Sequence, residues 1–185
     1  PTPRRRSFRL HRHLSIRNQQ TRIRHTRILK TRFLLTMELE PTTAVLYTDG
    51  ASKGNPGPAG AGFVLSDTSG RTLASAGIPL GVTTNNVAEY RGLIGGLEAA
   101  RELGVTVIHV RSDSELMCRQ LGGQYRVKSA RLRPLFEKAM QLLGEFDTVR
   151  IEHVRREFNE LADRLASDAA KASGRGRGES HGAGR

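Results

Sequence analysis

Short β-branched runs alternate with segments whose apolar residues recur at helical spacing, and this alternation restricts residues 44–170 to a mixed α/β fold. The predicted strands cover 44–49, 61–66, 72–80, 105–110 and 149–154. The predicted helices begin near 83–86 and end at Gly104, cover 115–121, pass through 132–143, and begin again near Asn159. Turn residues at 50–60 and 67–70 join the first three strands into an antiparallel meander. Because strands and helices alternate after the meander, we expect a mixed five-stranded sheet flanked by helices.

Positive charge is concentrated at the two ends of the chain. The net charge of the 185 residues is +12, to which residues 1–36 contribute +11, residues 171–185 contribute +3 and residues 37–170 contribute −2. An argument from overall charge to a nucleic-acid ligand therefore applies only to the ends. The single cysteine excludes an internal disulfide framework, and no run of 18 apolar residues predicts a membrane-spanning helix.

The arginine-rich segment 1–36 has three interpretations. It is an organelle transit peptide, a disordered arm that binds phosphates, or sequence that precedes a functional start at Met37. We expect a disordered basic extension over 1–36, a folded domain over 37–170 and a flexible Gly/Arg-rich tail over 171–185. The expected location is the cytoplasm, or an organelle if 1–36 is a transit peptide. No segment suggests an obligate protein partner, so we expect a monomer.

Four acidic residues fall at the ends of predicted elements. Asp49 closes the first strand, Glu89 lies in the first turn of the first long helix, Asp113 follows the fourth strand, and Asp163 lies four residues after Asn159 in the last helix. Ligands of open α/β sheets collect at the carboxyl ends of strands, so these side chains can converge. Crowded carboxylates repel one another unless a cation neutralises them, and a set of oxygen ligands selects Mg²⁺ or Mn²⁺. Two such ions about 4 Å apart can promote phosphodiester hydrolysis.

Most of these acids also have a purely structural interpretation. The alternatives are turn chemistry at Asp49–Gly50, a capping-box-like helix start from Asn86 to Glu89, and an ordinary solvated helix acid at Asp163 facing Arg156 or Arg164. Spacing alone leaves these alternatives open, although all of them together require several coincidences at the ends of elements.

Four segments carry a resemblance to a known family. YTDGASKGNPGPAGAGFVL (47–65), TTNNVAEYRGLIGGLEAA (83–100), VRSDSELMCRQLGGQYRVK (110–128) and HVRREFNELADRLASDAA (153–170) closely resemble type 1 ribonuclease H, in the family's order. The resemblance covers about 44–170 and implies the ribonuclease H-like fold. Residues 121–130 are too short for the Lys- and Trp-rich insertion of many members, so the chain is similar to the compact subclass without that basic protrusion.

The resemblance also implies roles for individual residues. Its metal-binding acids fall on Asp49, Glu89, Asp113 and Asp163, and its mobile histidine, thought to help product release, falls on His153. Asn159 matches the asparagine beside that histidine, and the residues expected to contact nucleic acid are Asn55, Thr84, Asn85, Asn86 and Asn159.

The implied activity is hydrolysis of the RNA strand of RNA/DNA hybrids by an endonuclease with two Mg²⁺ ions, or Mn²⁺ in their place. Family chemistry implies products with 5′-phosphate and 3′-hydroxyl ends. Two alternatives remain open: a catalytically weak hybrid-binding module, and another nuclease on the same fold.

Overall fold

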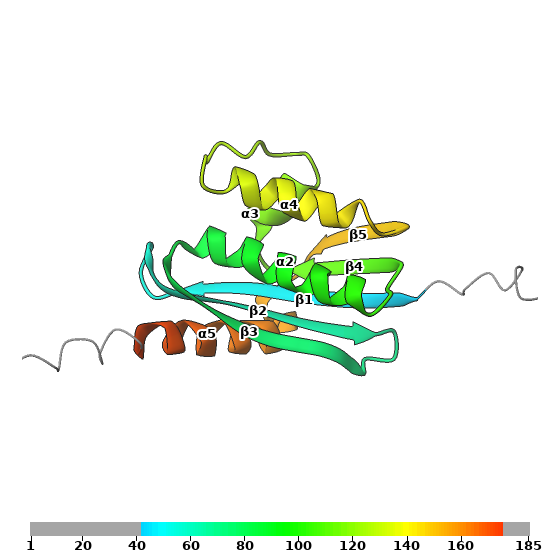
Figure 1. The fold of residues 1–185 in the computed structure, drawn as a ribbon, viewed down its shortest axis with the longest axis horizontal. Coiled ribbons are helices and arrows are strands. Elements are labelled where there is room, and N and C mark those ends of the chain that lie inside the picture. The colour runs from blue at the N-terminus through cyan, green and yellow to red at the C-terminus, as the bar shows by residue number, and fades with distance from the viewer. Residues whose placement is uncertain (1–41, 176–185) are drawn as a thin grey trace, which may run out of the picture. The chain divides into compact units, whose positions relative to one another are not determined.

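The computed structural model describes residues 42–175, so the predicted extension 1–36 and the last ten residues of the predicted tail, 176–185, lie outside the described residues. Along the chain the elements are β1 (Thr43–Ser52), β2 (Gly57–Asp67), β3 (Thr72–Thr83), α2 (Asn85–Glu102), β4 (Val107–Ser112), α3 (Glu115–Leu121), α4 (Arg133–Leu143), β5 (Thr148–His153), the short helix η1 (Arg156–Phe158) and α5 (Glu160–Arg175) (Figure 1). Among these residues no helix combines the length and apolarity needed to cross a membrane.

The predicted mixed five-stranded sheet is confirmed, with the strand order β3-β2-β1-β4-β5. β1 is antiparallel to β2 and parallel to β4, and β4 is parallel to β5. The register pairs Thr48 with Ser112, and Ser112 with His153. The carboxyl ends of three parallel strands therefore meet at one edge of the sheet, which is the edge where Asp49 and Asp113 lie.

One face of the sheet carries most of the hydrophobic core. Helix α2 packs on β1 and β2, and α4 packs against α2, so these two helices lie side by side over this face (Figure 1). Leu46, Leu93, Leu97, Ile108 and Val110 are completely buried there. Burial of each such side chain contributes about 1.5–3 kcal/mol, which fixes α2 and its acid Glu89 relative to β1.

Helix α5 covers the opposite face by packing small residues onto small residues. A Cβ at Gly62 of β2 would clash with the backbone of α5 at Ala162 and Ala166, so glycine is required for this close approach. The buried face of α5 consists of alanines, whereas Leu161, an apolar residue of the same helix, is 60% exposed. The helix continues through Arg175, so 171–175 are helical and do not begin the flexible tail.

The glycine-rich segment 50–60 is mostly strand, although the sequence predicted a turn. β1 extends to Ser52, β2 begins at Gly57, and Gly50 pairs with Ala61 across the ladder. Asp49 therefore lies inside a strand, and the alternative that Asp49–Gly50 is only turn chemistry is wrong. Similarly, β4 lies two residues later than predicted, at 107–112, which leaves Asp113 immediately after its last residue.

Candidate active site

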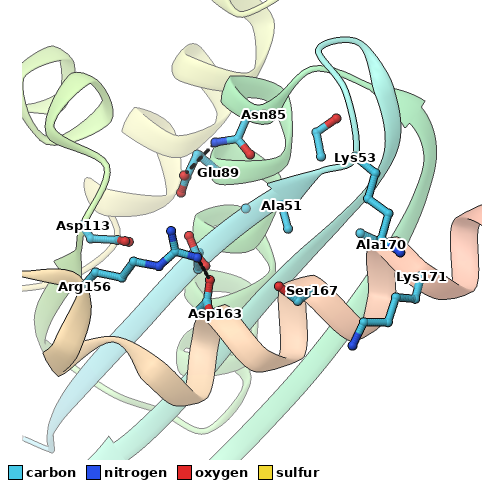
Figure 2. Close-up of a pocket in the computed structure, with 13 residues that line it drawn as sticks. Ala51, Lys53, Asn85, Glu89, Asp113, Arg156, Asp163, Ser167, Ala170 and Lys171 are labelled. Atoms are coloured by element: carbon cyan, nitrogen blue, oxygen red, sulfur yellow. Dashed lines mark hydrogen bonds and ion pairs between the residues drawn. The ribbon is translucent and has the colours of Figure 1, made fainter.

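All four predicted carboxylates line one open pocket of about 420 Å³ (Figure 2). Asp49 comes from β1, Glu89 from α2, Asp113 from the residue after β4, and Asp163 from the first turns of α5. The rest of the charged and polar lining consists of Ser52, Lys53, Asn85, Arg156, Ser167 and Lys171. The four acids that meet in this pocket are up to 114 positions apart in sequence.

Gly50 allows α2 to lie close enough to β1 for Glu89 and Asp49 to share the pocket. A Cβ at this position would clash with the backbone nitrogen of Glu89 and lie 2.9 Å from the Ala88 side chain. The helix begins at this point because Thr84 accepts a hydrogen bond from the Val87 backbone N–H, at 3.4 Å. Glu89 is therefore not part of a capping box: its side chain is directed to the pocket, where it accepts a hydrogen bond from Asn85.

Two of the acids, Asp49 and Glu89, are buried beside other carboxylates, and the pKa of each is raised. Burial, followed by the charges of Asp49 and Asp113, raises the pKa of Glu89 to about 9. Burial and the charge of Asp113 likewise raise the pKa of Asp49 to about 7, although the Gly50 N–H opposes this change. Each carboxylate is only 5% exposed. A cation among them would offset the repulsion and restore the ionised forms.

Two asparagines hold the acids in place. Asn159 donates from Nδ2 to the Thr48 carbonyl at 3.0 Å and to Asp113 Oδ1 at 2.8 Å. Asn85 donates from Nδ2 to Glu89 Oε1 at 3.2 Å. Asn159 is 1% exposed, so the prediction that it contacts nucleic acid does not fit this structure; it positions a carboxylate instead.

The remaining predicted site residues lie around the rim. His153 is exposed, and its Nε2 lies 3.2 Å from the Asp113 carbonyl oxygen. Asn55 Oδ1 accepts from the backbone N–H of Asn85 at 3.2 Å, which ties the β1–β2 turn to the start of α2. Thr84 caps α2, and Asn86 is exposed beside it. Their contact with a substrate stays a prediction.

The donor set fits a hard divalent cation. The carboxylates supply only oxygen, and Glu89 Oε2 is buried with no hydrogen-bond partner in the described part of the chain. Such oxygens suit Mg²⁺ or Mn²⁺. Within residues 42–175, no three acidic, histidine or cysteine side chains are already arranged closely enough to hold an ion. Instead, the Arg156 guanidinium contacts Asp163 at 2.5 Å, so the ion-pair interpretation of Asp163 is confirmed alongside its place in the pocket.

Sequence reasoning missed part of the pocket. Lys53, Ser167 and Lys171 line it, but they were not among the predicted site residues. Ser167 and Lys171 follow Asp163 by four and eight residues on α5, so helical spacing from that acid is the signal that could have found them.

Comparisons with known proteins find similar sequences and similar folds. A family model described as reverse transcriptase-like matches residues 47–169. Ribonuclease HI of Halobacterium salinarum is 46% identical over 123 residues, which are 66% of this chain and 62% of the relative. The crystal structure of RNase H1 from that archaeon superposes with a TM-score of 0.68 and 44% identity, and covers 70% of this chain and 98% of that one.

The chain belongs to the type 1 ribonuclease H family. A second ribonuclease H relative is the bifunctional protein Rv2228c of Mycobacterium tuberculosis, which is 45% identical over 130 residues, 70% of this chain. The match spans only 36% of the length of that relative. Its N-terminal RNase H domain, solved as a fusion with maltose-binding protein, superposes with a TM-score of 0.72 and 42% identity over 74% of this chain and 99% of that chain.

A third ribonuclease H relative was solved with nucleic acid. The structure of LC11-RNase H1 in complex with an RNA/DNA hybrid has a TM-score of 0.67 and 40% identity, and covers 70% of this chain and 98% of that chain. The predicted ribonuclease H-like fold is thus confirmed.

Proposed function

We propose that this ribonuclease H is an endonuclease that hydrolyses the RNA strand of RNA/DNA hybrids. The observation that carries the proposal is the pocket in which Asp49, Glu89, Asp113 and Asp163 meet from four separate elements (Figure 2). Membership of the family and the hybrid bound by a relative at 40% identity support the choice of substrate.

The acids are proposed to hold two divalent cations, Mg²⁺ or Mn²⁺. When bound, such a pair would lower the pKa of an attacking water and stabilise the departing 3′-oxygen, leaving 5′-phosphate and 3′-hydroxyl ends. Asp49 and Glu89 would supply the deeper oxygens, since both are buried, whereas Asp163 is more accessible, with its side chain 29% exposed. Asn159 and Asn85 would keep Asp113 and Glu89 aimed at the ions.

The rim is proposed to bind the hybrid. Asn55, Thr84, Asn85 and Asn86 lie together where the β1–β2 turn meets the start of α2, beside the acids. Their amide and hydroxyl groups suit phosphate and 2′-hydroxyl contacts, which distinguish RNA from DNA. His153 is exposed beside Asp113 and is proposed to assist departure of the product.

A module that only binds hybrids is the weaker alternative. Burying Glu89 and Asp49 beside Asp113 is unfavourable for the ionised acids, as their raised pKa values indicate. Such an arrangement would weaken the binding of a polyanion unless cations were present. Bound cations would neutralise the crowded acids and supply the catalysis, so the arrangement favours an enzyme over a module that only binds.

A cleavage assay tests the proposal. A labelled RNA strand is presented to the full chain as an RNA/DNA hybrid, as an RNA duplex and alone, and a DNA duplex is the fourth substrate, each with Mg²⁺, Mn²⁺ or EDTA. We expect metal-dependent cutting of the hybrid inside the RNA strand, with 3′ ends that a polymerase extends. Absence of cleavage with both metals, or equal cutting of the DNA duplex, would contradict the proposal.

A further inference from the structure

A protein cation already sits against one of the four acids. Arg156 lies in η1, between β5 and α5, and its side chain turns into the pocket between Asp113 and Asp163 (Figure 2). Its Nη2 atom is 2.5 Å from Asp163 Oδ1. Because Asp163 is a proposed metal ligand, the guanidinium contacts an oxygen that a divalent cation would need.

Arg156 interacts with more than one carboxylate. Its pKa is raised, first by the hydrogen bond to Asp163 and further by the charges of Asp49 and Asp113. The other cations of the lining are Lys53 and Lys171, and Lys171 pairs with Asp168, outside the group of four acids. Within residues 42–175, Arg156 is the one basic side chain that forms an ion pair with any of the four acids.

We infer that Arg156 is a positioning residue that neutralises Asp163 in the metal-free enzyme and leaves it when a divalent cation binds. The inference rests on the proposed function, because it takes the four acids as the metal site. Binding of the cation is then coupled to release of the guanidinium. Because the ion pair must be broken, the pocket binds the metal more weakly than it would without Arg156.

The neighbouring arginine provides a matched control. Arg155 carries the same charge one position earlier, and its side chain is 80% exposed, close to the 75% of Arg156, but its Nη1 contacts Glu157 at 3.3 Å. It is absent from the pocket lining. Loss of Arg155 therefore changes the net charge near the site as loss of Arg156 does, without freeing Asp163.

Binding of Mn²⁺ alone to the full chain tests the inference, with free Mn²⁺ measured by electron paramagnetic resonance. We expect Arg156→Ala to bind Mn²⁺ about three- to tenfold more tightly than wild type, because an ion pair and a like-charge repulsion are both removed. Arg155→Ala should stay within about twofold of wild type. Equal affinities of the two variants would overturn the inference and leave the proposed function intact.

An Asp49→Asn variant separates the two claims in the same titration. If wild type binds Mn²⁺ no better than Asp49→Asn, the pocket is not the metal site, and the proposed function and this inference fail together. A second measurement follows the guanidinium itself by NMR, with the Arg156 Nε–H signal assigned by its loss in Arg156→Ala. We expect this signal to move during a Mg²⁺ titration with the midpoint of metal binding; a signal unchanged at saturation would overturn the inference.

Discussion

Asn159 holds the Asp113 carboxylate through a hydrogen bond of 2.8 Å from Nδ2 to Oδ1. The same nitrogen donates to the carbonyl of Thr48, the residue before Asp49, at 3.0 Å. One buried amide at the start of α5 therefore connects β1, the end of β4 and the last helix. The relative positions of three of the four acids depend on this side chain.

Replacing Asn159 with alanine should loosen the acids. Two acceptors lose their donor, so we expect the free energy of unfolding to fall by about 1–3 kcal/mol. Mn²⁺ affinity and hybrid cleavage should each fall about 10–100-fold, as for other residues that orient metal ligands. Denaturant unfolding, Mn²⁺ titration and cleavage rates measure the three effects. The exposed Gln141→Ala is the control, and an Asn159→Ala enzyme as active as that control would contradict the positioning role.

The stability of the metal-free protein should fall as pH rises from about 5 to about 9. The folded-state pKa of Glu89 is raised from 4.5 to about 9, so between these values the folded state binds more protons than the unfolded state. The stabilisation from the protonated acid is complete below the unfolded pKa and is lost as pH passes the folded pKa. Asp49 contributes in the same direction up to about pH 7.

Glu89→Gln isolates this effect, because the amide does not titrate. In EDTA we expect the loss of unfolding free energy between pH 5 and 9 to shrink by about 2–4 kcal/mol in the variant. Saturating Mg²⁺ should flatten the wild-type curve in the same way, since the cation favours the ionised acids. If the unfolding free energies of wild type and Glu89→Gln changed with pH in parallel, the pKa of Glu89 would not be raised in the folded state.

Gly50→Ala should separate β1 from α2. The added Cβ would clash with the backbone at Glu89, and backbone at a helix start moves less readily than a side chain. We expect a loss of about 1–3 kcal/mol in unfolding free energy and about 100-fold in cleavage rate, because the two acids would be misplaced. Gly144→Ala is the control, since its Cβ would come no closer than 3.4 Å to any atom. If the two variants behaved alike, close approach at Gly50 would not be required.

Sequence pattern alone predicted the order of the elements and placed the acids at their ends, because burial periodicity and β-branched runs depend on local spacing. The pattern failed where packing between elements determines which residues lie in a strand or face the core. The glycines of 50–60 were predicted to form a turn. Gly50 and Gly60 are instead strand residues kept small so that α2 and α5 can approach the two faces of the sheet, and Gly54 is the glycine that lies in the turn. Leu161 is exposed for the same reason, since only alanines fit the face of α5 that lies on Gly62.

The sequence also did not determine which arginine pairs with Asp163. Arg156 and Arg164 were equally acceptable neighbours by spacing. The turn of η1 brings Arg156 back over the pocket, whereas Arg164, next to Asp163 on α5, is exposed and outside the pocket lining. A pairing of this kind depends on the path of a loop, which local periodicity does not specify. For the same reason, the sequence did not predict that Asn159 is buried.

The most direct test of the account compares hybrid cleavage by wild type and Asp49→Asn in saturating Mg²⁺. The control is Asp147→Asn, the same substitution at an exposed aspartate outside the pocket. We expect Asp147→Asn to cut the RNA strand at the wild-type rate. Asp49→Asn should remain folded but cut at least about 1,000-fold more slowly, because the metal site loses a buried ligand. Equal cleavage by wild type and Asp49→Asn would contradict the claim that these four carboxylates form the catalytic metal site.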